Sequence, residues 1–178
     1  MGGVIRGTGT LNVANITFTN NGTISPGSSP GDLTVLGNLL QGASGILEFE
    51  IGGTTTGSFD RLIMSSGTAT LGGTLVLAFV GGFAPGLGDT FDLIVGNASG
   101  GFGDVQITGL APGFLYDLAV GPGGLTLTAN SDGSFVPEPA TALLLGFGIL
   151  GLIAAGWRSR SFRSVGGEAP AVLEAEAG

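Results

Sequence analysis

Short apolar segments separated by glycine run along most of the chain. Glycine supplies 37 of the 178 residues and stands between short runs of Leu, Ile, Val, Phe and Thr. The glycines follow no three-residue period, which excludes a collagen triple helix. Short apolar runs closed by Gly, Pro, Asn or Asp predict many strands joined by turns. We therefore expect an all-β domain over residues 1–135, with about nine strands and no helix of useful length.

Alternation of apolar and polar residues is clearest in the segment ILEFEI, residues 46–51. Leu47 and Phe49 are predicted to face a core, while Glu48 and Glu50 face water. The segment LGGTLVLAFV, residues 71–80, is apolar on both faces and predicts a central strand buried on both sides. Strands of this kind suit either a β-solenoid, in which coils stack on one another, or a β-sandwich of two antiparallel sheets. Strand density alone does not separate the two.

The residue types present limit the chemistry. The chain has no Lys, His or Cys, so the most usual general base, the commonest metal ligand and every thiol nucleophile are missing. The net charge is −8, and residues 1–135 hold nine acids against two arginines. An acidic surface repels phosphate backbones, which argues against nucleic-acid binding. We expect no enzymatic activity, no cofactor and no metal site.

An uncharged segment, Ala140–Trp157, follows the expected β domain. As a helix, its 18 residues span about 27 Å, close to the thickness of a bilayer core. No polar face interrupts it, which disfavours a buried helix of a soluble domain. We predict a transmembrane helix over 140–157 with the preceding domain outside the cytoplasm. The basic residues expected to stop transfer are Arg158, Arg160 and Arg163.

The stretch VPEPATALLLGFGILGLIAAGWRSR, residues 136–160, resembles a PEP-CTERM sorting signal. The resemblance rests on three parts in order: the tripeptide Pro137, Glu138 and Pro139, an apolar segment, and a basic cluster. The two prolines also predict an extended, exposed hinge that a processing enzyme can grip. We assign the signal to residues 136–163 and a disordered acidic tail to residues 164–178.

The resemblance implies a route to the cell surface. In that family of exported bacterial proteins, the membrane enzyme exosortase recognises the tail, and the proteins are associated with extracellular matrix, exopolysaccharide and biofilm. The expected partners are therefore exosortase, membrane lipid and exopolysaccharide. The expected location is a single-pass membrane protein, or one released to the surface after processing. Family members usually begin with a signal peptide, which residues 1–13 do not resemble. A truncated or mis-assigned start, or a longer precursor that has been cut, is therefore expected.

The segment NNGTISPGSSPGDLTVLGNL, residues 20–39, is similar to a segment of autotransporter-like passenger domains and of many PEP-CTERM proteins. The segment 59–94 likewise resembles the terminal part of such passengers, where strand pairs close the coil. This resemblance implies the end of a right-handed parallel β-solenoid with a strand-pair cap. The β-sandwich stays the alternative.

Two patterns invite a chemical interpretation. Glu48 and Glu50 lie on one face of a strand, about 6.6 Å apart along it, within the range of glycosidase carboxylates. The segment GGFGDVQI, with Asp104, approximates a calcium-binding nonapeptide, but in one copy only. A solvated strand face and a turn explain them more simply. We therefore expect a non-enzymatic structural or adhesive surface protein, with a membrane-anchored carbohydrate-active β-helix enzyme as the alternative. A fragment of a larger adhesin is a third hypothesis.

Overall fold

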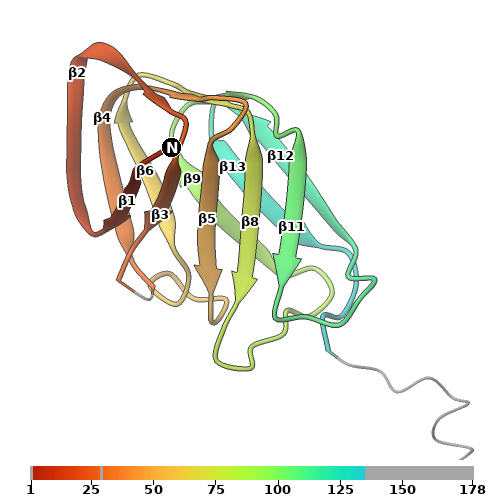
Figure 1. Cartoon of the computed structure of the whole chain (residues 1–178). Coiled ribbons are helices and arrows are strands. Elements are labelled where there is room, and N and C mark those ends of the chain that lie inside the picture. Colours follow the sequence, from red (N-terminus) through yellow and green to blue (C-terminus); the bar gives the residue numbers. More distant parts are fainter. Residues whose placement is uncertain (1, 29, 135–178) are drawn as a thin grey trace, which may run out of the picture. The chain divides into compact units, whose positions relative to one another are not determined.

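Thirteen β-strands form the part of the chain that the structure, a computed structural model, describes: residues 2–28 and 30–134. The chain divides into two units, Met1–Phe135 and Val136–Gly178, and every described strand belongs to the first. The strands form two sheets, called sheet A and sheet B (Figure 1). The described residues are therefore all-β, as predicted, with more strands than the nine expected.

The chain visits the two sheets in turn, so that strands distant in sequence become neighbours. Sheet A holds, in spatial order, β1 (Val4–Gly7), β3 (Thr23–Pro26), β5 (Ile46–Ile51), β8 (Thr74–Phe79) and β11 (Asp104–Thr108). Sheet B holds β2 (Gly9–Asn20), β4 (Asp32–Gln41), β6 (Arg61–Ser66), β7 (Ala69–Leu71), β9 (Thr90–Val95), β10 (Ala98–Gly100), β12 (Tyr116–Gly121) and β13 (Gly124–Ala129).

Parallel pairing identifies the architecture as a β-solenoid of about four turns. In sheet A, every strand after β1 pairs in parallel with the strand one coil earlier. In sheet B, β2, β4, β6 and β9 also pair in parallel. Such ladders separate the solenoid from the antiparallel β-sandwich that was its alternative. One position thus recurs from coil to coil, at Val4, Thr23, Ile46, Thr74 and Asp104.

The core lies between the two sheets and consists of aligned aliphatic and aromatic side chains. In β5 the prediction is confirmed: Leu47 and Phe49 are fully buried, and the two glutamates lie on the outer face. Strand β8 was expected to be buried on both faces, and this is wrong, because Val76 and Ala78 on its outer face are only half-buried. Among the described residues no further layer lies outside sheet A, so the outer apolar side chains are less buried than the inner ones.

Glycines allow the strands of sheet B to bend at the same level in successive coils. Gly37, Gly67 and Gly96 all have positive φ, at 118°, 74° and 109°. A Cβ on Gly37 would lie 2.3 Å from the carbonyl oxygen of Val13, and one on Gly67 would lie 2.4 Å from that of Gly37. Any other residue would therefore meet the backbone of the coil below it. This close stacking explains part of the chain's glycine content.

The two kinds of corner differ in length. From sheet B to sheet A the connections are short in every coil: residues 21–22, 42–45, 72–73 and 101–103. From sheet A to sheet B they lengthen from Thr8 alone to 27–31, then 52–60 and 80–89, with 109–115 after β11. Added residues are thus confined to one side of the solenoid.

Antiparallel strands and aromatic rings close the C-terminal coil. β13 pairs antiparallel with β9, and β12 pairs antiparallel with β13. The strand pairs that close the coil were expected within residues 59–94, but of these three strands only β9 begins there. Aromatic rings join β8 to the start of β12. Phe79 contacts Phe114 edge to face at 5.7 Å between ring centroids, and Phe114 stacks on Tyr116 at 6.1 Å. Phe83 and Phe91 extend this aromatic cluster into the core. Aromatic pairs add stabilisation beyond the area they bury.

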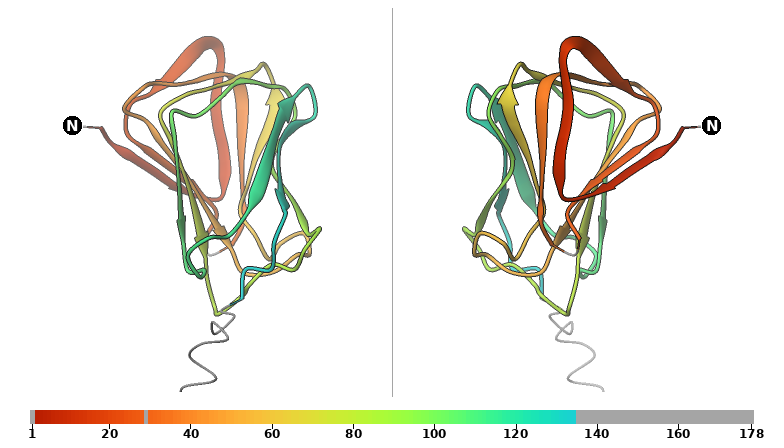
Figure 2. Two further views of the ribbon diagram at one scale, coloured as in Figure 1. Left: turned by 90° about the vertical axis from the view of Figure 1, so that its right-hand side faces the viewer. Right: turned by 90° about the vertical axis from the view of Figure 1, so that its left-hand side faces the viewer.

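The first coil is built differently (Figure 2). β1 and β2 pair only with β3 and β4, so one edge of each strand carries no described partner. β2 bulges at residues 14–16, between Val13 and Thr17, where later coils bend at glycine. Val4 and Ile16 are each 64 % exposed. The first coil is consequently less buried than the inner coils of the solenoid.

Candidate functional site

The sorting-signal residues predicted from the sequence lie outside the described residues. This holds for Pro137, Glu138 and Pro139, for Arg158, Arg160 and Arg163, and for the helix expected over 140–157. Residues 2–28 and 30–134 contain no helix long and apolar enough to cross a membrane.

The segment that leads toward the signal is fixed to the solenoid. The Asn130 N–H donates to the Leu115 carbonyl at 2.8 Å, and the Leu115 N–H donates to Ser131 Oγ at 2.9 Å. The Gly133 N–H donates to the Pro85 carbonyl at 2.9 Å. Gly133 itself is buried, and a Cβ there would meet Pro85 at 2.6 Å. The β domain is therefore held by hydrogen bonds as far as Gly133.

The glutamates that suggested a glycosidase lie on the outer face of β5. Glu48 Oε2 is 3.6 Å from Arg6 Nη2, in a loose ion pair whose arginine is 66 % exposed. The next strand of the sheet places Val76 beside Glu48 and Ala78 beside Glu50. This apolar neighbour strand offers no further carboxylate and no aromatic sugar platform at those two positions. The surroundings fit a solvated strand face.

Asp60 was not singled out from the sequence, yet it is the one buried acid among the described residues. It is 1 % exposed, and its two carboxylate oxygens accept from the Gly31 and Glu50 N–H groups, each at 2.8 Å. Burial raises the pKa of Asp60 to about 6, against those hydrogen bonds and with help from the charges of Glu50 and Glu48. Because both oxygens bond the backbone, the side chain joins two corners and is not aimed at a ligand.

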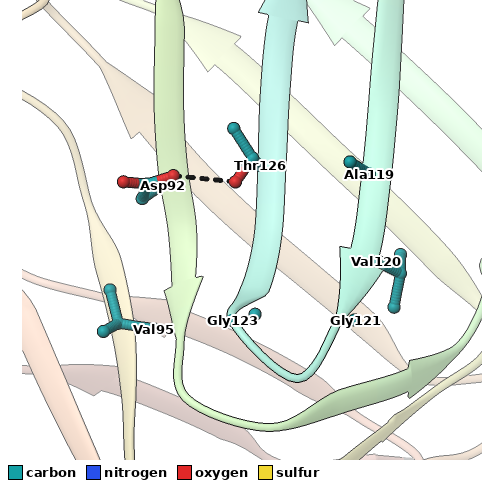
Figure 3. A pocket seen from close by; sticks show the side chains of 8 residues that line it. Asp92, Val95, Ala119, Val120, Gly121, Gly123 and Thr126 are labelled. Atoms are coloured by element: carbon teal, nitrogen blue, oxygen red, sulfur yellow. Dashed lines mark hydrogen bonds between the residues drawn. The ribbon is translucent and has the colours of Figure 1, made fainter.

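A shallow hollow of about 370 Å³ lies on β9, β12 and β13 (Figure 3). Thr126 Oγ1 donates to Asp92 Oδ1 at 2.7 Å on its floor. Val95, Ala119 and Val120 line the remainder together with glycines. The hollow contains one carboxylate and no cation or aromatic ring, which gives it little means of orienting a polar ligand.

The calcium-like segment also lacks the groups for a metal. Asp104 lies in β11, where it accepts from Gln106 Nε2 at 2.9 Å. Within the described residues, no three metal-ligating side chains come together. The segment forms the end of one coil and the start of the next.

Comparison with known proteins bears on the C-terminal segment. A family model of the PEP-CTERM protein-sorting motif matches residues 135–161. The match includes the Pro137–Pro139 tripeptide, Arg158 and Arg160, while Arg163 lies beyond it. The motif implies an exported, membrane- or surface-associated protein that exosortase processes. A search of curated proteins found no match to the chain, and the likeness to autotransporter passengers stays a prediction.

Proposed function

We propose that the chain is a non-enzymatic structural or adhesive protein of the cell surface or extracellular matrix, delivered there by its C-terminal sorting signal. The match of residues 135–161 to the sorting motif carries the proposal, because it supplies the route to the surface. The solenoid supplies a rigid, acidic body at the end of that route.

The residue types of the chain and the contacts of its charged side chains support a structural role. The chain has no His, Lys or Cys. Arg61 pairs with Asp32 through two hydrogen bonds, from Nε at 3.0 Å and Nη2 at 2.5 Å. Arg6 faces Glu48, and Asp60 bonds the backbone. These contacts hold coil to coil, which is the arrangement expected of a scaffold.

Intact-mass measurement on membrane, surface and medium fractions of the native host tests the delivery route. We expect a species that ends within Val136–Pro139 in the surface or medium fraction. Glu138→Gln removes the acid of the tripeptide and should leave full-length protein in the membrane. Glu168→Gln is the matched control, because it removes one acid from the tail outside the motif. Retention of the wild-type chain in the cytosol would contradict the proposal.

A binding measurement separates a matrix role from mere display at the surface. Exopolysaccharide prepared from the host should co-sediment with the full-length chain but not with an exported protein of similar charge. An acidic body makes binding of a neutral or cation-bridged polysaccharide the expected form. Absence of co-sedimentation would leave delivery intact and remove the adhesive role.

The enzymatic alternative requires a pair of carboxylates, and Glu48 and Glu50 are the pair that one strand face brings together. If the protein degrades host polysaccharide, Glu48→Gln with Glu50→Gln should abolish the activity. Asp104→Asn is the matched control on another strand of the same sheet. We expect no degradation by the wild-type chain.

A further inference from the structure

Two exposed leucines lie on the last two corners from sheet A to sheet B, on either side of the chain that leaves β13. Leu87 is 76 % exposed and Leu115 is 61 % exposed. The Gly88 N–H donates to the Ala129 carbonyl at 2.8 Å, and the Asn130 N–H donates to the Leu115 carbonyl at 2.8 Å. Both corners and the end of β13 lie at the lower end of the solenoid in Figure 1. We call Leu87 and Leu115 the exit leucines.

Hydrogen bonds hold the backbone of both exit leucines. The Gly86 N–H donates to Asp89 Oδ2 at 2.8 Å, and the Asp89 N–H donates to the Gly86 carbonyl at 3.1 Å, so Leu87 lies in a closed turn. The Leu115 N–H donates to Ser131 Oγ at 2.9 Å. An ordered backbone therefore presents each side chain to solvent, and neither leucine is part of the hydrophobic core.

An earlier corner on the same side shows that the fold does not require exposed leucine there. The corner at residues 52–60 exposes Thr54, Thr55 and Thr56. The segments 80–88 and 109–115 instead contain neither a charged residue nor a hydroxyl group. Exposed apolar residues are ordinary when they are scattered singly, whereas apolar residues gathered at one place indicate a contact surface.

The sequence distance to the predicted membrane segment indicates what this surface meets. Gly133 is buried, and its N–H donates to the Pro85 carbonyl at 2.9 Å, so the chain is still attached to the corner of Leu87 at that point. Ala140, where the predicted membrane segment begins, follows seven residues later. Seven residues span at most about 25 Å in any conformation. While that segment lies in a bilayer, the exit leucines are therefore within reach of the membrane surface.

The charges near the exit leucines favour a lipid surface without net charge. Residues 80–134 contain aspartates and no basic residue, and Asp89 and Asp132 are neighbours of the two corners in sequence. Anionic headgroups would repel these acids, whereas a zwitterionic headgroup layer accepts leucine side chains without the help of a cation. The contact would consequently depend on apolar burial alone.

We propose that Leu87 and Leu115 contact the headgroup layer of a zwitterionic membrane while the sorting signal holds the chain there. The inference rests on the proposed delivery, because it requires residues 140–157 to enter the bilayer. Two leucine side chains bury too little apolar area to retain a protein at a membrane. The contact would therefore orient the tethered solenoid, with its last two corners toward the lipid, and would not outlast cleavage of the signal.

Fluorescent labels on introduced cysteines test the contact, because the chain has no cysteine of its own. The full-length chain is reconstituted into phosphatidylcholine vesicles that contain a lipid with a quencher near its headgroup. Pro112→Cys places the label on an exposed position between the exit leucines and keeps both of them. Ala43→Cys, exposed on a corner from sheet B to sheet A, sets the background. Quenching at position 112 should exceed this background about threefold, and equal quenching would overturn the proposal.

Substitution of the exit leucines shows whether they make the contact. Leu87→Asp with Leu115→Asp, carrying the label at position 112, should lower the quenching to the background. Leu40→Asp is the matched control, because Leu40 is a 38 % exposed leucine near the end of β4, beside a corner of the other kind. Unchanged quenching in the double variant would overturn the proposal.

Trp157 separates failure of this proposal from failure of the delivery, because it is the single tryptophan of the chain and ends the predicted membrane segment. Its fluorescence is measured in the unlabelled chain with the same quencher lipid. Quenched Trp157 with an unquenched label at position 112 would overturn the membrane contact and leave the delivery standing. Unquenched Trp157 would overturn both, since both require that segment to enter the bilayer.

Vesicle composition identifies the surface that the leucines meet. Adding phosphatidylglycerol should weaken quenching of the label at position 112, because the nearby acids are repelled. Stronger quenching on these anionic vesicles would contradict the apolar basis of the contact. A label whose emission shifts to the blue without lipid quenching would also overturn the proposal, because another part of the protein or a second copy would then cover the leucines.

Discussion

The first coil and the coils behind it carry the same residue types at equivalent positions, yet only the inner coils bury them. Ile5 and Ile24 occupy one register position on neighbouring strands, but Ile24 is fully buried and Ile5 is not. The difference is the presence of a coil on both sides. In this solenoid, a side chain's contribution to stability is set by its neighbouring coils more than by its own strand.

Truncation of the two isoleucines should show this difference most strongly. Ile24→Ala removes fully buried atoms between two coils and should lower the free energy of unfolding by about 2–5 kcal/mol. Ile5→Ala, at the exposed end, should cost about 1 kcal/mol. Urea unfolding followed by far-ultraviolet circular dichroism measures both. Equal losses would show that the first coil is covered in solution.

Two glycines of similar backbone conformation offer a second matched pair. Gly7 has φ of 108° with open space around a Cβ, whereas Gly37 has φ of 118° and the Val13 carbonyl at 2.3 Å. Gly37→Ala should therefore lower stability by about 2–3 kcal/mol through strain and collision. Gly7→Ala should lower it by about 1 kcal/mol through conformation alone. The same unfolding measurement applies, and a larger loss at Gly7 would contradict the stacking described for the corners.

The buried carboxyl of Asp60, which joins two inner corners, should make the free energy of unfolding depend on pH. The first coil contains no such carboxyl. Its pKa rises from 3.8 when unfolded to about 6 when folded, so the folded state holds the proton more tightly. Its contribution is fully present below about pH 4 and is lost as the pH rises through 6. We expect about 1–3 kcal/mol of stability to disappear between pH 4 and pH 7.

The control for Asp60 is Asp60→Asn, which does not titrate. Subtracting its pH profile from that of the wild-type chain isolates this carboxyl from the exposed acids. A difference profile that is flat between pH 4 and pH 7, or that rises with pH, would show that the two N–H donors outweigh burial.

The two arginines of the solenoid should give the smallest contrast. Arg61 makes a two-point contact with Asp32, and Arg6 lies 3.6 Å from Glu48 with most of its side chain in solvent. Arg61→Gln should cost about 1 kcal/mol, and Arg6→Gln should change stability by less than about 0.5 kcal/mol. Added salt should reduce the first effect. A larger loss for Arg6→Gln would show that β1 is more firmly attached than its exposure indicates.

Local patterns predicted local structure well. The alternation of Leu47, Glu48, Phe49 and Glu50 identified both faces of β5. The glycine-bounded apolar runs predicted the all-β class. The tripeptide, apolar run and arginines form a contiguous motif, and this contiguity is why the sorting signal could be identified without a structure.

Long-range contacts were not predictable in the same way. Nothing beside Asp60 in the sequence indicates that it bonds Gly31 and Glu50, which are 29 and 10 residues away. The outer face of β8 was assigned to a core because Val76 and Ala78 are apolar, and only the coil arrangement shows that no other described strand covers them. The pairing of coils also had to be known before Val4 and Asp104 could be placed at opposite ends of one row.

The unequal corners determine where this protein can diversify. Connections from sheet B to sheet A stay short, while those from sheet A to sheet B extend to residues 80–89 without disturbing the pairing of β8 with β5. Insertions on the long side change the surface and leave the hydrogen-bond ladder intact. Peptide epitopes or affinity tags grafted between residues 52 and 60 should be displayed without loss of the fold. The same insertions between residues 72 and 73 should prevent the coils from stacking.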